Sequence, residues 1–299
     1  MSTLSRKIDF AVIVTVNNAN PNGDPLNGNR PRVNYDGYGE LSDVSIKRKI
    51  RNRLMEMKHP IFVQSDDNRN DEYRSLRQRA EGVLSNVDMK DDKKYREAAC
   101  KAWFDVRAFG QVFAYSGGKK GKKKAEGEEE EGGDAAGVSI GIRGPVSIHP
   151  AFSVAPVLDR VSSIQITKSV SGEGDGAKRA SDTMGMKHRV DHGMYLFYGS
   201  MNPQLASKTG FTNDDAAAIK EALRTLFRND ASSARPEGSM EVYKLYWWQH
   251  TSANGQYSSA KVHRLLKVAI KTDQPKAIED YSIVLGKLPG LACEEIDGE

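Results

Sequence analysis

From Ile8 to Val16, apolar side chains recur with the two-residue period of a β-strand. The intervening positions include Ala11 and Ile13, so both faces of this strand are largely apolar. A strand with two apolar faces must be covered on both sides, and we therefore expect it at the centre of a sheet.

The pattern changes after this strand. Residues 19–39 contain Asn-Pro, Asn-Gly, Asp-Pro and a second Asn-Gly, which predict an irregular loop. Ser42 or Asp43 can cap the helix that follows. Its apolar residues fall on one narrow stripe: Ile46, Ile50, Leu54 and Met57.

Further helices and strands complete an α+β pattern. Tyr95–Trp103 and Asp214–Arg228 are predicted helices, the second capped by Thr212 or Asn213. Strands are predicted over residues 105–115 (broken by Gly110), 138–149, 192–201, 240–250, 262–271 and 281–285. With insertions ignored the order is β, α, β, β, α, β, the split βαβ arrangement of ferredoxin-like and RRM domains. Such sheets bind single-stranded RNA, but they also host unrelated functions.

Three stretches interrupt this core. Residues 61–92 are polar and charged, as in an insertion or peripheral helices. Residues 116–137 are of low complexity and predict a disordered loop. Weak alternation over residues 151–170 is followed by a polar, glycine-rich stretch at 171–181, which predicts an extended hairpin arm with a polar tip.

Charge adds a candidate partner. The 299 residues have a net charge of +4, and because residues 119–134 contribute −1, the remainder carries +5. The helix after Ser42 contains only two acids, Asp43 and Glu56, so its cations look unneutralised and favour an anionic partner over a merely solvated surface. Five cations flank the apolar stripe: Lys47, Lys49, Arg51, Arg53 and Lys58. A sixth, Arg48, is expected to point away from the others.

The cysteines and the apolar runs argue against a disulfide-rich, zinc-binding, secreted or membrane-spanning protein. Cys100 and Cys293 are far apart and in no paired spacing, which argues against a disulfide framework or a thiolate zinc site. No apolar run reaches membrane-spanning length, and no small-residue cleavage pattern of a signal peptide follows the first strand. We therefore expect a cytoplasmic protein without a membrane partner or a cofactor.

Several motifs, each weak alone, occur in a specific order. They are Asn20–Pro25 (NPNGDP), Asp43–Arg53 (DVSIKRKIRNR), Asp105–Gly110 (DVRAFG), Gly141–Val146 (GIRGPV), Met184–Arg189 (MGMKHR) and Thr209–Phe211 (TGF). Together they resemble the CRISPR-associated RAMP proteins, and among these the backbone subunit of the type I-C Cascade surveillance complex. The resemblance covers nearly the whole chain.

This resemblance implies a single domain over residues 1–299. It would consist of an RRM-like palm with a finger or peripheral insertion at about 59–102, the Lys/Glu loop at 116–137 and a β-hairpin thumb at about 155–185. Copies of such a subunit polymerise head to tail along one guide RNA (crRNA), together with other Cascade subunits, in antiviral defence. The guide pairs with target DNA, so the protein would hold the backbone while base pairing reads the sequence.

Candidate RNA-binding residues come from the loop, the helix, the palm and the thumb. Amides and a glycine allow close approach to phosphate, and cations supply charge without base preference. Met184 or Met186 is a candidate wedge between bases or a core residue, and Arg107 is equally expected to bind RNA or to pair with an acid such as Asp105. The full set is Asn20, Asn22, Gly23, Asn29, Arg30, Lys47, Arg48, Lys49, Arg51, Arg53, Arg107, Gln111, Arg143, Lys168, Met184, Lys187, His188 and Arg189.

Catalytic interpretations are weaker. His188, Asp191 and His192 suggest a metal site, but hydrogen-bonded or RNA-contacting histidines fit this loop-to-strand pattern better. A RAMP-type endoribonuclease processing CRISPR RNA would carry a glycine-rich loop near its C-terminus, which residues 286–290 match poorly. Type III backbone subunits, which resemble this chain, use a loop Asp to cut target RNA. Asp24 or Asp182 could be proposed for that role here, but neither has a visible partner, and acids in such loops usually form turns. We expect no catalysis and no bound metal.

Overall fold

The computed structural model describes residues 2–88, 91–115, 138–168 and 183–299. The low-complexity loop predicted at 116–137 and the predicted polar tip of the hairpin arm lie outside the described residues.

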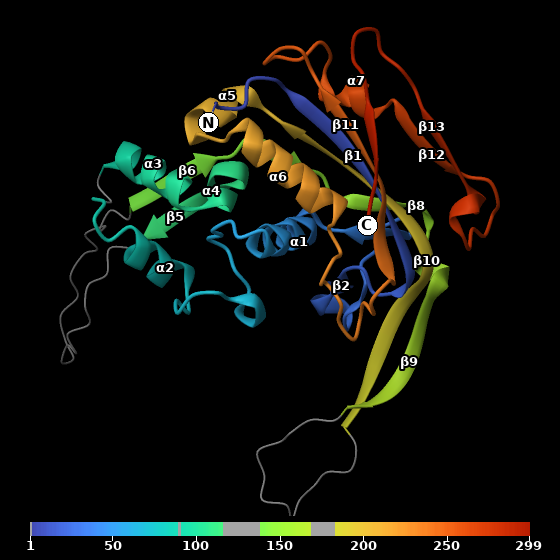
Figure 1. Cartoon of the computed structure of the whole chain (residues 1–299). Helices are drawn as coiled ribbons and strands as arrows, with labels where there is room; N and C mark the ends of the chain where they lie inside the picture. Colours follow the sequence, from blue (N-terminus) through green and yellow to red (C-terminus); the bar gives the residue numbers. More distant parts are fainter. Residues whose placement is uncertain (1, 89–90, 116–137, 169–182) are drawn as a thin grey trace, which may run out of the picture.

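A large antiparallel sheet forms the centre of the molecule (Figure 1). As its apolar pattern predicted, β1 (Ile8–Ala19) is central, paired with β10 (Thr183–Met201) on one side and β11 (Met240–Gln249) on the other. The strand order is β14-β11-β1-β10-β8-β4, with β7 and β9 also pairing with β10. The remaining bounds are β4 Tyr38–Leu41, β7 Val146–Ile148, β8 Ala151–Pro156, β9 Val161–Lys168 and β14 Glu294–Asp297.

Both faces of this sheet are covered, which explains the doubly apolar pattern of β1. Phe10 and Val12 belong to the cluster beneath α1 (Asp43–Glu56) and α6 (Asn213–Arg224), which lie side by side in Figure 1. Ala11 and Ile13 face the opposite cluster. That cluster is closed by α7 (Ser259–His263) and the hairpin of β12 (Leu266–Ile270) and β13 (Tyr281–Leu285).

The predicted caps fix where the two large helices begin. Ser42 Oγ accepts a hydrogen bond from the Ser45 amide at 3.2 Å, so Ser42 is the N-cap of α1. Thr212 and Asp215 form a reciprocal capping box at the start of α6. Each box or cap satisfies amides that the first helical turn leaves without partners. The prediction of a strand over residues 262–271 is partly wrong, because Ser259–His263 is helical.

A lobe with its own apolar cluster lies beside the sheet (Figure 1). It contains α2 (Leu76–Val83), α3 (Asp92–Ala102), α4 (Phe104–Phe109) and the hairpin of β5 (Gly110–Tyr115) and β6 (Val138–Arg143). The cluster runs from Phe62 to Ile140, further along the chain than the insertion expected at 59–102. The strand expected at 105–115 is wrong in its first half, because residues up to Phe109 belong to the helix α4 and the strand β5 begins only at Gly110.

A long hairpin projects from the body of the molecule (Figure 1). Its strands are β9 and the first half of β10, paired from Lys168–Thr183 at the far end to Val161–Val190 at the base. Because β10 continues into the central sheet, the arm and the core share one strand.

Short elements connect these parts. They are β2 Gly23–Asp24, η1 Pro25–Asn27, β3 Arg30–Pro31, η2 Asp66–Asn68, η3 Leu158–Arg160, α5 Pro203–Thr209 and η4 Ile278–Asp280. Among the helices of the described ranges, none is both long and apolar enough to cross a membrane.

Candidate nucleic-acid interface

Asparagine side chains hold the loop after β1 in shape. Asn22 Oδ1 accepts from the amide and the hydroxyl of Ser42 at 2.9 and 3.0 Å, which ties the loop to the first turn of α1. Asn20 Nδ2 donates to the Asn29 carbonyl at 2.6 Å, across the loop, while Asn20 Oδ1 is buried without a partner. Asn29 has a φ of +58°, a conformation that asparagine tolerates better than most residues. The side-chain amides of Asn20 and Asn22, which were predicted to contact RNA, therefore hold the loop in its conformation.

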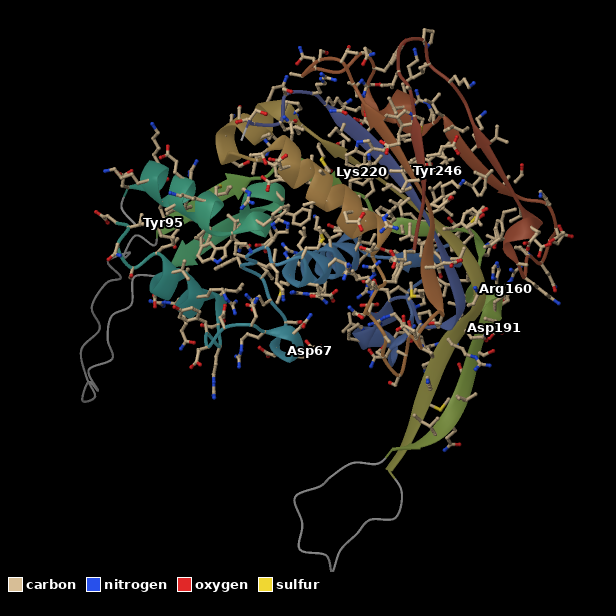
Figure 2. All side chains as sticks on the ribbon, in the orientation of Figure 1. Asp67, Tyr95, Arg160, Asp191, Lys220 and Tyr246 are labelled. Carbon is tan, nitrogen blue, oxygen red and sulfur yellow. The ribbon has the colours of Figure 1, made fainter. Side chains whose placement is uncertain are left out.

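The loop and α1 form one wall of a cavity of about 530 Å³. Four predicted residues meet in it: Asn22, Gly23, Arg48 and Lys49. Two segments that were not predicted complete its wall. These contribute Ser65, Asp67, Asn68, Asn229, Asp230, Ala231, Ser232 and Arg235. Figure 2 labels Asp67, on the turn between the lobe and α1.

Lys49 is the most buried cation in this cavity, with 5% of its side chain exposed. It donates to Asp230 Oδ2, and the same oxygen accepts from Arg235 Nε at 3.0 Å. Burial lowers the pKa of Lys49 to about 8, and the Asp230 carboxylate opposes that fall. Lys49 also lies over the ring of Phe227, 5.3 Å from its centre. The free protein thus holds this lysine against a carboxylate.

Arg48 was expected to point away from the other cations of α1, but it lines the same cavity as Lys49. Its guanidinium donates to the Val63 carbonyl at 2.8 Å, on the segment that leads into the lobe. Asn52 lines the same cavity, and its Oδ1 is buried without a partner. Arg48 therefore offers its remaining donors at the junction of body and lobe.

The interpretation of α1 as an unneutralised cationic helix is wrong. Lys47 pairs with Asp43 at 2.9 Å, and Arg51 pairs with Asp105 at 2.8 Å. Arg53 pairs with Glu56 and donates to Thr225 Oγ1 at 3.0 Å. Asp43 and Glu56 lie on α1 itself, whereas Asp105 and Thr225 are brought to it by folding. Asp105 also accepts from the amides of Phe62 and Val63, so the Arg51 pair anchors the lobe.

The candidates in the lobe lie away from the cavity. Arg107 makes two hydrogen bonds to Asp215, at 2.7 and 3.0 Å, and stacks over Phe104. Gln111 donates to the Val112 carbonyl, and Arg143 is exposed on β6. Both residues belong to the β5–β6 hairpin, whereas Gln111 was expected on or beside the central sheet of the palm. Two roles were considered for Arg107, RNA binding and pairing with an acid, and in the structure it pairs with Asp215 on α6.

The candidates at the base of the arm form a second group. His188 is buried and shares a 2.7 Å hydrogen bond with Ser163, while Arg189 lies 3.5 Å from Asp191, which Figure 2 labels. Burial, and then the nearby charge of Arg30, lower the pKa of His188, so this histidine is neutral at pH 7. Arg30 thus lies near the arm. Lys187 is half-buried, Met186 is exposed, and the side chains of Lys168 and Met184 lie outside the described residues.

The candidate catalytic residues have structural partners. His192 Nδ1 lies 2.7 Å from Asn17 Oδ1, and no cluster of three metal-ligating side chains occurs in the described part of the chain. Asp24 accepts from the Leu26 amide and pairs with Arg32, as expected of an acid that shapes a turn. Asp182 lies outside the described residues. In the region 286–290, the turn lies at its end, where the Leu291 amide donates to the Leu288 carbonyl at 3.2 Å.

Sequence reasoning missed the residues that complete the cavity, above all Asp230 and Arg235. They follow α6 in a polar stretch that begins at Asn229, whose φ is +59°. The run Arg228-Asn229-Asp230 signals a turn. Nothing in its local pattern indicates that it packs against the loop after β1, where the Asn20 amide donates to the Ala234 carbonyl.

Comparisons with known proteins find similarity to CRISPR-associated proteins. A CRISPR-associated protein Cas7 of Haloferax volcanii is 28% identical over 240 residues, which cover 78% of this chain and 67% of that protein. Two solved chains described as a CRISPR RNA-guided surveillance complex, one of them pre-nicking, are 14% and 16% identical, with TM-scores of 0.41 and 0.39. They match 81% of this chain and 78% and 68% of their own. The family model of CRISPR-associated protein Cas7 matches residues 6–286, and this chain is therefore a member of that family.

Proposed function

We propose that this chain is a non-catalytic backbone subunit that binds crRNA in a type I-C Cascade complex. The observation that carries the proposal is the cavity beside α1. Four residues chosen from sequence line it together, and they bring two cations, an amide and a glycine to one place. Such groups bind a phosphodiester backbone without reading its bases.

Three parts of the fold support this role. The strands β11-β1-β10-β8, with α1 and α6 on one face, would be the RRM-like palm. The β9–β10 hairpin would be the thumb and the lobe the finger. Because Arg30 lies near His188, the loop after β1 leads from the cavity toward the base of the arm. A single strand of RNA following this loop would meet first the cavity and then the thumb.

Assembly and cellular setting are part of the same proposal. Copies of the subunit would follow one another head to tail on the guide, together with other Cascade subunits, in the cytoplasm. Target DNA would be recognised through pairing with the guide. The protein's own contribution would be charge and shape along the backbone.

Sizing the protein with synthetic crRNAs of two lengths tests the assembly. We expect several copies on one RNA, and more copies on the longer one, measured by light scattering after gel filtration. A single copy on both lengths would contradict a backbone subunit. Specific cleavage of repeat-containing RNA in the presence of Mg²⁺ would instead favour the RAMP-type endoribonuclease.

Variants of the cavity test the site. Arg48→Ala should weaken RNA binding equally across sequences and reduce the dependence of affinity on salt by about one phosphate contact. Arg96→Ala removes the same charge from an exposed pair with Asp92 on α3 and serves as the control. Equal affinities for the two variants would contradict an RNA site in this cavity.

A further inference from the structure

In the free protein, the positive and negative side chains of the cavity beside α1 balance. Its cations are Arg48, Lys49 and Arg235, and its acids are Glu56, Asp67 and Asp230. Three positive and three negative side chains leave no net charge. A phosphate that entered this cavity would meet carboxylates as well as cations, so one carboxylate has to move aside for the phosphate to bind.

The three acids are not equivalent. Glu56 is held by Arg53 and also accepts from Asn229 Nδ2 at 3.1 Å. Asp67 is exposed on η2, at the rim. Asp230 alone holds two cations of the cavity at once, Lys49 and Arg235, through the same oxygen. Among the acids of this cavity, Asp230 therefore occupies the position where an anionic ligand would gain most.

We propose that Asp230 is a placeholder for an RNA phosphate. It holds Lys49 and Arg235 in place while the site is empty, and it gives them up when a phosphodiester enters. This inference rests on the proposed function, because it assumes that the polyanion binds in this cavity.

Burial explains why such a placeholder is needed. Only 5% of the Lys49 side chain and 16% of Asp230 are exposed. A buried ammonium without a partner is costly, so Lys49 needs an anion beside it in the free protein and in the complex alike. A carboxylate and a phosphodiester each carry one negative charge, and the exchange therefore preserves the ion pair while Asp230 returns to water.

The position of Asp230 allows this exchange. It follows α6 in an irregular segment, and its amide donates to the Phe227 carbonyl at 3.1 Å. The backbone there is anchored, so a rotation of the side chain alone can release both cations. The cavity would therefore select long RNA over small anions. A small anion must displace the Asp230 carboxylate and gains nothing else, whereas a long RNA makes contacts elsewhere on the protein that offset the cost of displacing it.

Replacement of Asp230 by asparagine removes the placeholder charge and keeps the two cations of the site, Lys49 and Arg235. Affinity for a guide-length single-stranded RNA, measured by fluorescence anisotropy at several salt concentrations, should be about tenfold higher in D230N than in the wild type. The slope of affinity against salt should steepen by about one phosphate contact. A short oligonucleotide, which lacks the other contacts, should gain by a larger factor than the long RNA.

Asp67→Asn is the matched control, because it removes one negative charge from the same cavity but no partner of Lys49 or Arg235. The proposal expects D230N to bind more tightly than D67N. Equal affinities would mean that net charge alone acts, and weaker binding by D230N would mean that Asp230 orients Lys49 for the ligand. Either result overturns the placeholder.

A double variant tests whether the gain in RNA affinity of D230N depends on Lys49. In a Lys49→Met background, D230N should gain much less affinity than it does alone, since its main partner is gone. If D230N does not fold, D230S offers Arg235 a hydroxyl acceptor and gives the same readout. Absence of RNA binding by the wild type would contradict the proposed function itself. A different result would contradict only the placeholder: the wild type binds RNA, K49M weakens that binding, and D230N binds no more tightly than D67N.

Discussion

At the scale of single residues, cations that the sequence presents as an unneutralised helix face are mostly paired within the fold. Lys49 and Arg53 are each 5% exposed, although their helix reads as strongly cationic. Lys49 pairs with Asp230 after α6, and Arg53 pairs with Glu56 on its own helix and donates to Thr225. The cationic face therefore becomes a set of ion pairs and hydrogen bonds. Arg107 follows the same rule through Asp215.

Lys49 should give the stability of the protein a pH dependence. Its pKa in the folded protein is about 8, because burial disfavours the charged form, whereas an unfolded lysine titrates at about 10.4. Between these values the unfolded chain binds more protons, so stability rises with pH over this window. Urea unfolding from pH 7.5 to 10.5 should show this rise for the wild type relative to Lys49→Met. Parallel curves for the two proteins would contradict it, and Lys47→Met controls for loss of a lysine from the same helix.

Replacement of Arg107 should affect stability and not RNA binding. Asp215, which is 8% exposed, would lose its bidentate partner, and we expect a loss of about 2–4 kcal/mol in the free energy of unfolding. Arg96→Ala breaks an exposed pair and should cost no more than about 1 kcal/mol. Chemical denaturation and RNA titration of both variants measure the two effects. Weaker RNA binding by a stable Arg107→Ala protein would restore the role first considered for this residue.

At the scale of elements, the junction between α4 and β5 depends on one glycine. The residues before Gly110 are apolar enough to be read as a strand, yet they form a helix whose last residue is Phe109. Gly110 has a φ of +84°, which allows the chain to turn from helix to strand. A Cβ at this position would lie 2.3 Å from the Ile142 carbonyl oxygen.

Gly110→Ala should therefore destabilise the lobe by more than about 2 kcal/mol, from backbone strain and from the clash with β6. Gly141 lies in the same hairpin, and a Cβ there would meet no atom of the described residues within 4 Å. Gly141→Ala should change the free energy of unfolding by less than about 1 kcal/mol. Similar thermal stabilities of the two variants would show that the φ of Gly110 is not required.

At the scale of the whole molecule, the lobe has an apolar cluster of its own, separate from the clusters on the two faces of the central sheet. The helices α1 and α6 share the main cluster with the sheet, whereas Phe62, Trp103 and Phe113 centre the cluster of the lobe. The rings of Phe62 and Trp103 lie 4.6 Å apart, and those of Phe62 and Phe113 lie 5.1 Å apart. Parts of a protein with separate cores can open separately.

Phe62→Ala should loosen the lobe before the sheet. Loss of this buried ring costs about 3–5 kcal/mol locally, so amide hydrogen exchange should accelerate in α3 and β5 while β1 remains protected. Phe197→Ala, which removes a buried ring from the main cluster, is the control and should accelerate exchange in β1. Equal acceleration in both regions for Phe62→Ala would mean that lobe and sheet unfold as one unit.

The sequence by itself determined the elements whose pattern is local. The central position of β1 follows from its two apolar faces, and the starts of α1 and α6 follow from Ser42 and Thr212, because periodicity and capping act within a few residues. The tertiary structure alone decided the state of the charges. Lys49 and Asp230 are 181 residues apart and Arg51 and Asp105 are 54 apart, and such pairs form only once packing has brought distant segments together. For the same reason the wall of the cavity contributed by residues 229–235 has no signal in the local sequence.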